Sequence, residues 1–346
     1  MVKSWAESIR DDLLWARIHL RRHEVRAQVT IDRHFKAARS QIEALLQQDQ
    51  RMNAVRDARL RATIFVYNRM RPLMREMAQV AKATIGFRMY RAAEDTRRTT
   101  RAAFFMEPHP HLLREQEGDI PHESLEGILP WEEMPAAMYE EVLTADLLGT
   151  TLEAWAGKFP EAFLPAMAQE YALGIAAGES VALITHRMKK AFDLPNYRAK
   201  AMARTAVMAA SNDMQSRIYK ANEHLLTGYK FTATLSIRTC EECGGYDGNV
   251  YAVDESRPAL PIHLQCRCNY APVMKSAKEL FGEDIQIAPH LRAAMDGAEP
   301  STVTWEDWIK REENQKKLEA FQKAMRQKAY KKAKAKKKAK EKAAKK

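Results

Sequence analysis

Helix-breaking residues are missing from the N-terminal part of this 346-residue chain, whose first proline is Pro72 and whose first glycine is Gly86. These two residue types disfavour a helix interior most, so a long stretch without them favours long helices. Apolar residues recur there at the three- and four-residue spacing of one helix face. They are Trp5, Ile9, Leu13, Ile31, Phe35, Ala38, Ile42, Leu45, Ile64, Phe65, Leu73, Met77 and Val80. The sequence therefore predicts two or three long amphipathic helices, packed as a hairpin or bundle.

Charge is strongly segregated along the sequence, although the formal net charge is +11. Residues 1–106 carry 22 Lys and Arg against 11 Asp and Glu, and residues 107–175 carry 2 against 14. Residues 176–322 carry 19 of each sign. The basic helix faces of the first segment are either solvated or contact DNA or an acidic partner. The acidic segment either masks the protein's own basic surfaces or docks a basic partner, and the sequence does not choose between these.

The last residues, 323–346, consist almost wholly of Lys and Ala, with 13 Lys and Arg against the single Glu341. Such a segment cannot bury enough apolar surface to form a core, so it is predicted to be a solvated helix or a disordered arm. We expect it to neutralise the phosphates of double-stranded DNA without reading base sequence, and a solubilising tail with no partner is the alternative. The lysines expected to contact DNA are Lys331, Lys332, Lys334, Lys336, Lys337, Lys338 and Lys340.

Residues 107–165 combine acidic charge with closely spaced prolines, which predicts a connector or an extended arm. The prolines at its start are Pro108, Pro110, Pro121, Pro130 and Pro135. Its histidines, His109, His111 and His122, have no cysteine nearby and a spacing that suits no standard zinc site. We therefore expect these histidines to be exposed to solvent.

Helices are predicted to resume near Phe163. Ser180 is a suitable cap for a helix that ends at Asp193-Leu194-Pro195, and a longer helix should run from about Asn196 to Leu226. Alanines are frequent in this second helix, which permits close packing against a neighbour. Two helices separated at the proline are therefore expected ahead of the cysteine-containing region.

Residues 229–238, YKFTATLSIR, alternate between apolar and polar side chains, which predicts a half-buried β-strand. All four cysteines of the sequence follow it within a short distance. Cys240 and Cys243 have the two-residue separation that lets two thiolates face one metal ion. A turn at Asp247-Gly248 should then reverse the backbone into a short strand, VYAV.

A second half-site offers His263, Cys266 and Cys268, so five candidate ligands compete for the four positions of a tetrahedral Zn²⁺ site. The set predicted first is Cys240, Cys243, His263 and Cys266. A complete ligand set leaves no open position for substrate, so the zinc would be structural. Cys268 could replace Cys266 or His263, or remain a free thiol. Reduced cysteines without metal and a redox CxxC pair are the competing interpretations, and disulfides are disfavoured without an export signal.

The cysteines belong to a longer run of motifs. The positions concerned are Arg204, Thr205, Arg238, Thr239, Cys240, Cys243, Asp247, Gly248, Pro261, His263, Cys266, Arg267 and Cys268. Their order and spacing over about residues 170–275 resemble the phage Mu F-like head-morphogenesis proteins, also called minor head or minor capsid proteins. Residues 304–312, TWEDWIKRE, resemble the Trp-containing helix that follows in that family. Ala206 and Ser236 replace a Glu and an Asp that are usual there, so the ion pairs of those acids are not available.

The resemblance implies a structural component of a tailed-phage or prophage head, assembled in the host cytoplasm and located in the head interior or at the portal vertex. Its implied partners are the portal protein, the major capsid protein or a scaffold protein, and its implied role is in DNA packaging or delivery. Arg204, Arg238 and Arg267 would then be structural hydrogen-bond or ion-pair donors, with direct DNA contact as the alternative.

The expected fold is mainly α with a small α+β module. Its predicted parts are long basic helices (1–106), the acidic connector (107–165), a module with a short antiparallel sheet and a zinc-knuckle-like cluster (166–275), a linker with a Trp-containing helix (276–322), and the basic tail (323–346). No window approaches the roughly 18 apolar residues of a membrane span, and no secretory signal is expected. No phosphate loop, nucleophile elbow or metal-hydrolase motif is present, so no enzymatic activity is predicted. The alternative function is a stand-alone zinc-containing nucleic-acid-binding regulator, which would need a compact recognition element.

Overall fold

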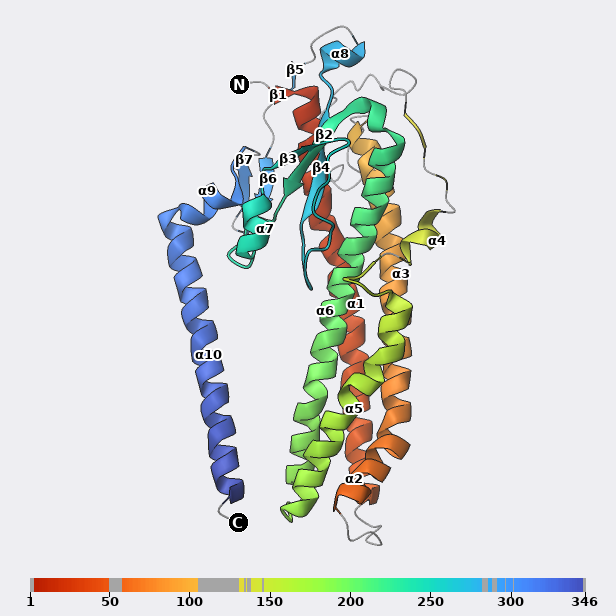
Figure 1. The fold of residues 1–346 in the computed structure, drawn as a ribbon, viewed down its shortest axis with the longest axis vertical. Coiled ribbons are helices and arrows are strands. Elements are labelled where there is room, and N and C mark those ends of the chain that lie inside the picture. The colour runs from red at the N-terminus through yellow and green to blue at the C-terminus, as the bar shows by residue number, and fades with distance from the viewer. Residues whose placement is uncertain are drawn as a thin grey trace, which may run out of the picture. The chain divides into compact units, whose positions relative to one another are not determined.

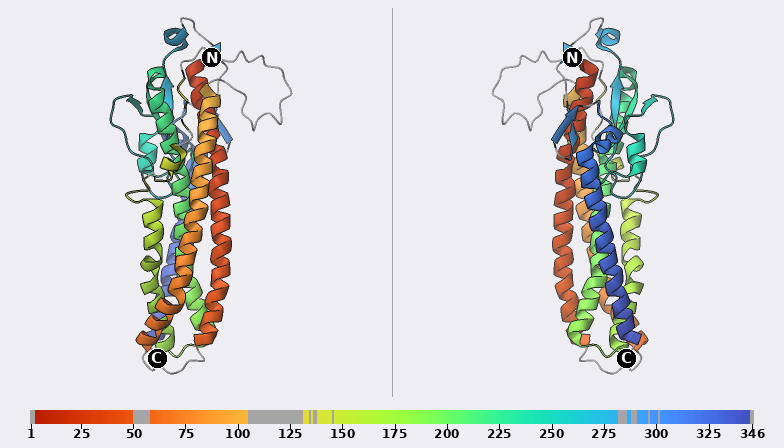
Figure 2. Two further views of the ribbon diagram at one scale, coloured as in Figure 1. Left: turned by 90° about the vertical axis from the view of Figure 1, so that its right-hand side faces the viewer. Right: turned by 90° about the vertical axis from the view of Figure 1, so that its left-hand side faces the viewer.

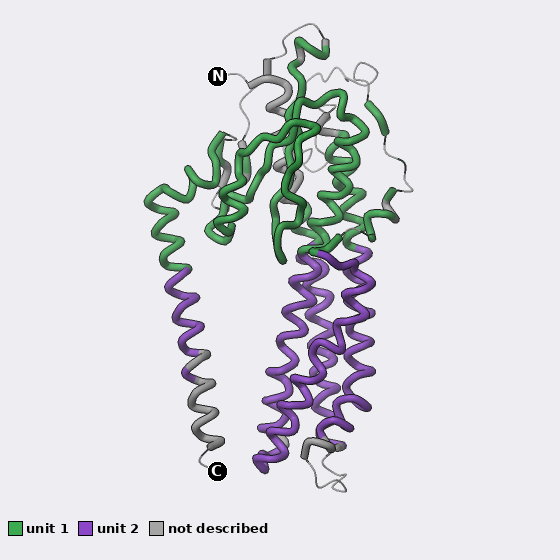
Figure 3. The backbone as a smooth tube through the Cα atoms, in the orientation of Figure 1, with its two compact units in different colours: residues 1–23, 88–148, 205–321 green, residues 24–87, 149–204, 322–346 purple. Residues whose placement is uncertain are grey.

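The computed structural model describes residues 3–49, 58–104, 131–133, 135, 138–144, 146–281, 286–287, 291–295, 297–300 and 302–344. The protein divides into two compact units, each assembled from three separate segments (Figure 3). Unit 1 comprises residues 1–23, 88–148 and 205–321, and unit 2 comprises residues 24–87, 149–204 and 322–346. The predicted exposure of His109, His111 and His122 concerns residues outside the described ranges.

The long helices predicted from the sequence are present. They are α1 (Trp5–Asp49), α2 (Ala58–Phe65), a π-helical turn (Val66–Met70), α3 (Arg71–Phe104), α5 (Leu152–Ala176) and α6 (Val181–Ala221). The parts of α1, α3, α5 and α6 that belong to unit 2 lie side by side (Figure 1, Figure 2). This unit is therefore the helical bundle that the apolar spacing predicted.

Aromatic side chains form part of the core of unit 2. The ring of Phe35 on α1 lies 6.3 Å from that of Phe159 on α5 and 5.3 Å from that of Phe192 on α6, between centroids. Phe65 of α2 packs at 4.6 Å from Tyr171 of α5. Buried aromatic pairs at these distances hold neighbouring helices together through large apolar contact areas.

The prediction that helices resume near Phe163 was wrong, because α5 already begins at Leu152. Thr151 caps the helix, its side chain accepting a hydrogen bond from the backbone N–H of Ala154. Pro160 and Pro165 lie inside the helix, and Pro160 is buried in the core. Packing of the apolar face thus outweighs the local cost of the two prolines.

The predicted break at Pro195 was also wrong, because α6 is one continuous helix with Pro195 inside it. Polar contacts with α1 lie on both sides of the proline. Lys189 donates to Glu43 at 2.6 Å, and Lys200 donates to Asp32 at 2.8 Å. These tertiary contacts within unit 2 support the helix where its own hydrogen bonding is interrupted.

Unit 1 contains a three-stranded antiparallel sheet with strand order β3-β2-β4. Its strands are β2 (Leu226–Thr232), β3 (Val250–Ala252) and β4 (Asn269–Met274). The predicted strand over 229–238 leaves the sheet after Thr232, and Leu235 makes only an isolated bridge to Ala294. The alternation was therefore interpreted correctly, but the strand is displaced towards the N-terminus.

Smaller elements complete the described part of unit 1. They are β1 (Lys3–Ser4) paired with β5 (Gln286–Ile287), α4 (Met138–Val142), a 3₁₀ turn (Glu223–Leu225), α7 (Glu241–Tyr246), α8 (Ala277–Phe281), the hairpin of β6 (Leu291–Ala294) and β7 (Gly297–Pro300), and α9 (Trp305–Lys310). The last helix, α10 (Glu312–Ala344), begins in unit 1. The lysine-rich tail is thus helical over its described length, which is one of the two states predicted. None of the helices in the described ranges has the length and apolar character that a membrane crossing needs.

The described part of the acidic segment pairs with the protein's own arginines. Glu133 accepts hydrogen bonds from Arg101 at 2.6 Å and from Arg97 at 3.3 Å, both on α3. The fully buried side chain of Asn222 binds both the backbone N–H and the carbonyl of Glu132. The sequence left two roles open for the acidic segment, masking the protein's own basic surface or docking a basic partner. Within unit 1, Glu133 has the first of these roles, because it pairs with Arg97 and Arg101.

Candidate metal centre

The five candidate ligands come from two turns that meet beside the sheet of unit 1. Cys240 caps the N-terminus of α7, where its sulfur accepts the backbone N–H of Cys243 at 3.4 Å. His263, Cys266 and Cys268 lie on the loop that leads into β4. The backbone N–H contact stabilises negative charge on the first sulfur, as expected for a knuckle.

The imidazole of His263 faces two of the sulfurs. Its Nε2 lies 3.3 Å from Sγ of Cys240 and 3.2 Å from Sγ of Cys243. Its Nδ1 lies 3.0 Å from the carbonyl oxygen of Leu264, which can only accept a hydrogen bond. Nδ1 therefore carries the hydrogen, and the lone pair of Nε2 points towards the thiols. A histidine that ligates metal is usually held by this kind of contact.

Cys243 is shared with a second group of ligands. The ligand atoms of Cys240, Cys243 and His263 all lie within 4.8 Å of one another, and so do those of Cys243, Cys266 and Cys268. Cys243, Cys266 and Cys268 are 2–3% exposed. No disulfide joins the four cysteines. The two turns thus bring all five predicted ligands to one place.

Hydrogen bonding among the three buried thiols shifts their pKa values in different directions. Contacts from Cys243 and then Cys268 lower the pKa of Cys266 far below that of a free thiol. Contact with Cys266 raises the pKa of Cys243, and contact with Cys243 raises the pKa of Cys268. The cluster therefore favours one thiolate among three sulfurs in the absence of a cation.

These side chains could hold a metal ion. In a tetrahedral zinc site with sulfur at about 2.3 Å and nitrogen at about 2.0 Å, the separation of sulfur and nitrogen is roughly 3.5 Å. The two S–N distances to His263 fall close to that value. Cys240, Cys243 and His263 then fill three of the four tetrahedral positions, and Cys266 and Cys268 are the alternatives for the fourth.

Residues 166–271 match the family model described as phage Mu protein F like protein. The segment is similar to that family, and we call it the Mu F-like module. The match includes all five candidate ligands and ends within β4. Neither curated proteins nor solved structures gave a match to the sequence.

Helix α6 supports the cysteine loop of the Mu F-like module. The buried hydroxyl of Thr205 accepts the backbone N–H of Gln265 at 2.8 Å. Asn212, two turns further on, donates to the carbonyl of Cys268 at 3.1 Å. Both contacts fix the backbone of the second half-site, since the two polar groups lie on one face of the helix.

The other motif positions have structural contacts. Within unit 2, Arg204 donates to the carboxylate of Glu24 at 3.1 Å, and that carboxylate side chain is 6% exposed. Arg238 is exposed, with its guanidinium 6.0 Å from the ring of Phe321. Thr239 donates to the carbonyl of Thr234.

Three further motif positions shape the loops around the cluster. Pro261 is buried just before His263, and Arg267 is half-buried between two of the cysteines. Gly248 has a φ of +93°, so it supplies the left-handed backbone that the predicted Asp247-Gly248 turn requires. The hydroxyl of Ser236, which stands where the family usually has Asp, accepts the backbone N–H of Arg238 at 3.2 Å.

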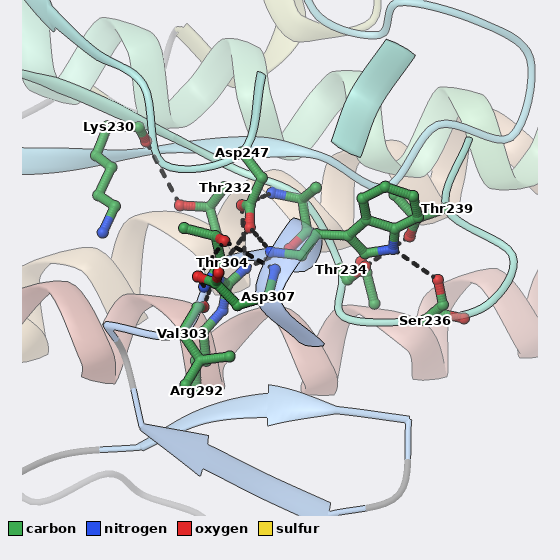
Figure 4. A network of polar contacts seen from close by, with 12 residues as sticks. Lys230, Thr232, Thr234, Ser236, Thr239, Asp247, Arg292, Val303, Thr304 and Asp307 are labelled. Carbon is green, nitrogen blue, oxygen red and sulfur yellow. Dashed lines mark hydrogen bonds and ion pairs between the residues drawn. The ribbon is translucent and has the colours of Figure 1, made fainter. Parts of the chain in front are cut away.

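The role of Asp247 was not predicted beyond the turn. Its carboxylate accepts hydrogen bonds from both terminal nitrogens of Arg292, from the backbone N–H of Ala233 at 2.7 Å and from that of Trp305 at 2.6 Å (Figure 4). Arg292 also donates to the carbonyls of Ala233 and Val303. This network explains why the backbone leaves the sheet after Thr232, since the polar groups of Ala233 are taken by Asp247 and Arg292.

Trp305 covers the knuckle from outside the matched segment. A Cβ at Gly244 would overlap the Trp305 ring, so the absence of a side chain permits this contact. The indole N–H donates to the carbonyl of Ser236 at 3.0 Å. Thr304 and Asp307 form a capping box that starts α9 at this tryptophan. Helix α9, predicted from TWEDWIKRE, is therefore fixed to the Mu F-like module by its first residue.

The predicted DNA-contacting lysines all lie on α10. Lys331 and Lys334 are exposed. The backbone of α10 continues through the positions of Lys332, Lys336, Lys337, Lys338 and Lys340. A helix with this spacing distributes lysines around its surface, which suits contact with phosphates and not the reading of bases.

Proposed function

We propose that this protein is a structural minor head protein of a tailed phage or prophage. It would act at the portal vertex or in the capsid interior, in head assembly and in DNA packaging or delivery. The observation that carries this proposal is the match of residues 166–271, which contains the Cys/His cluster, to the phage Mu protein F like family. No catalytic step is part of the proposal.

Zinc is the proposed cofactor, held by Cys240, Cys243, His263 and one of Cys266 and Cys268. Thiolate and imidazole donors suit Zn²⁺, and four protein ligands make a closed structural site. When bound, the ion would supply charge neutralisation for the thiolates and a cross-link between two turns. Such a cross-link stabilises a lobe with a small core, because metal binding adds to the free energy of folding.

The proposed partners are a head protein and double-stranded DNA. The portal protein, the major capsid protein or a scaffold protein would bind the Mu F-like module or the helical bundle. DNA would bind the lysines of α10 through phosphate charge, which gives non-specific contact. The distribution of charge supports this division, since residues 323–346 carry 13 Lys and Arg against one Glu.

The test is the location of the protein in phage particles. Heads would be purified from a host that produces the phage encoding it, and the protein would be quantified by mass spectrometry. We expect a fixed, small number of copies per head, protected from added protease until the head is opened. A protein that is absent from purified heads, or is present only in the cell extract, would contradict the proposal.

A further inference from the structure

A cavity of about 390 Å³ in the surface of unit 2 has no part in the function proposed above. It lies between α1 and the start of α3, where Ala44, Leu45, Pro72 and Leu73 supply an apolar lining. Ala44 and Pro72 are exposed, so the apolar surface of both helices faces solvent at this point. A recess with an apolar lining that opens to solvent is typical of a binding site.

The lining also carries one positive and one negative charge. Arg69 belongs to the π-helical turn that leads into α3, and Glu76 lies on α3 itself. Both side chains are exposed, and neither makes an ion pair within the parts of the chain that the structure describes. The third polar residue of the lining, Gln41, is uncharged. The cavity therefore presents opposite charges whose partners must come from another molecule.

The opposite side of α3 neutralises its charges within unit 2. Glu161 of α5 lies 2.8 Å from Arg71 and 3.7 Å from Arg75. Lys82 pairs in the same way with Glu153, which is also on α5. The basic residues that face α5 are thus paired inside the bundle, whereas the side with Arg69 and Glu76 is left to a partner.

The two charges are placed symmetrically about the apolar pair. Arg69 precedes Pro72 by three residues, and Glu76 follows Leu73 by three residues. Residues at these separations share one face of a helix. A two-fold axis between Pro72 and Leu73 would therefore place Arg69 of one copy opposite Glu76 of the other, and the reverse. A surface that meets itself in this way forms the isologous interface of a symmetric dimer.

We propose that this face of α3 binds a second copy of the same protein, in an antiparallel arrangement related by a two-fold axis. Pro72 of each copy enters the cavity of the other, and two ion pairs between Arg69 and Glu76 flank the apolar contact. Glu76 repels a wholly acidic partner, and Arg69 repels a wholly basic one. The same surface turned end to end brings both charges in the required order. The proposal involves neither the metal centre nor the DNA contact.

Sedimentation velocity of the full-length protein over a range of concentrations tests this proposal. We expect a reversible equilibrium between monomer and dimer. Arg69→Glu and Glu76→Arg each convert both ion pairs into contacts between like charges. Each variant should therefore raise the Kd of dimerisation at least about tenfold.

Mixing the two charge variants separates an interface from a folding defect. In an equimolar mixture, the two acidic side chains of the Arg69→Glu variant face the two arginines of the Glu76→Arg variant. Both ion pairs are then restored, so we expect heterodimers with a Kd close to the native value. The double variant Arg69→Glu/Glu76→Arg should dimerise with itself for the same reason. A variant that failed to fold could not be rescued in either way.

Two further variants test the apolar contact and the position of the charge. Ala44→Trp fills the cavity from an exposed position on α1 while both charges remain, and it should abolish the dimer. Arg33→Glu reverses the charge of an exposed arginine on α1 that does not line the cavity, and it should leave the Kd unchanged.

Three results would overturn the proposal. A native protein that stays monomeric at every concentration would assign this face to a different protein. A dimer that keeps its native Kd in Arg69→Glu, or in Ala44→Trp, would lie elsewhere on the molecule. A mixture of the two charge variants that forms no heterodimer would show that Arg69 and Glu76 do not face one another across the interface.

Discussion

Asp247 accepts a hydrogen bond at 3.1 Å from each of the two terminal nitrogens of Arg292, and both side chains are almost fully shielded from solvent. The pair joins residues 45 positions apart, one in the Mu F-like module and one beyond the matched segment. A buried guanidinium that loses its carboxylate keeps its desolvation cost without its partner. We therefore expect the buried ion pair between Asp247 and Arg292 to hold the β6–β7 hairpin and α9 on the module.

Replacing the carboxylate should destabilise unit 1 strongly. For Asp247→Asn we expect a loss of about 3–5 kcal/mol in the free energy of unfolding, because one buried charge is left unpaired. Urea unfolding followed by tryptophan fluorescence measures it. Lys316→Gln, which breaks an exposed ion pair with Glu312, is the control and should cost at most about 0.5 kcal/mol. Equal small effects in both variants would show that the buried pair is not needed.

The metal centre makes a second prediction. The purified full-length protein should contain about one zinc per molecule, and the Cys240→Ser/Cys243→Ser double variant should contain none. Because the ion cross-links two turns, its removal by a chelator should lower the melting temperature and increase hydrogen exchange in β2 and β4. If the purified protein contains no zinc, and its melting curve is the same with and without chelator, the proposed zinc site is wrong.

Single substitutions distinguish the two possible fourth ligands. If Cys266 binds the ion, Cys268→Ser should retain zinc and Cys266→Ser should lose affinity, and the reverse holds if Cys268 is the ligand. Elemental analysis after dialysis against a weak chelator measures the difference. Loss of zinc in both variants would mean that the coordination set is larger than four or changes with the substitution.

Gly244 and Gly245 are adjacent in α7 but differ in their surroundings. A Cβ at Gly244 would overlap the Trp305 ring, whereas one at Gly245 would meet nothing within 4 Å. We expect Gly244→Ala to cost about 1–3 kcal/mol by displacing α9. Gly245→Ala should be neutral or slightly stabilising, because alanine favours a helix more than glycine does. Urea unfolding and hydrogen exchange of α9 test the pair, and similar behaviour of the two variants would contradict the packing.

The sequence predicted the ligand cluster well because its information is local. The CxxC spacing, the Asp247-Gly248 turn and the second half-site each follow from short-range rules, and only the closing of two turns on one another had to be inferred. Arg292 offered no such signal. An arginine in a short strand resembles any surface arginine until its partner is known, so the buried pair could not be predicted from one sequence.

Prolines account for the errors in the helical region. Pro195 was interpreted as a break in what is α6, and the proline-containing segment up to residue 165, which includes the first part of α5, was interpreted as a connector, because proline disfavours a helix interior when it is considered alone. In the structure these helices pack along much of their length, and contacts such as Lys200 with Asp32 outweigh the local cost. The long helices of the first hundred residues were predictable because proline occurs there once, at Pro72, where it is the second residue of α3.

The basic tail should control DNA affinity without supporting the fold. Deleting residues 331–346 is expected to weaken binding to double-stranded DNA. In a plot of the logarithm of the binding constant against the logarithm of salt concentration, each lost phosphate contact should reduce the steepness of the slope by roughly 0.9. A full-length variant with the seven named lysines changed to Gln is the matched control, because it removes the charge of the tail without shortening it. Binding by both variants equal to that of the native protein would reject the DNA contact.

Asp32 predicts how the stability of unit 2 depends on pH. Hydrogen bonds from Lys200, then Lys36 and Asn196, lower the pKa of its carboxyl well below the usual value. A folded-state pKa below the unfolded value of about 3.9 stabilises the protein above that pH, and the contribution is lost as the pH falls through the lowered folded-state pKa. Asp32→Asn should therefore cost about 1 kcal/mol at pH 7 and progressively less below about pH 4. Asp193→Asn is the control, because Asp193 is 60% exposed and lies 3.5 Å from Arg39. A difference between the native protein and Asp32→Asn that stays constant from pH 7 to pH 3 would show that the Lys200 contact does not hold the carboxylate in its charged form.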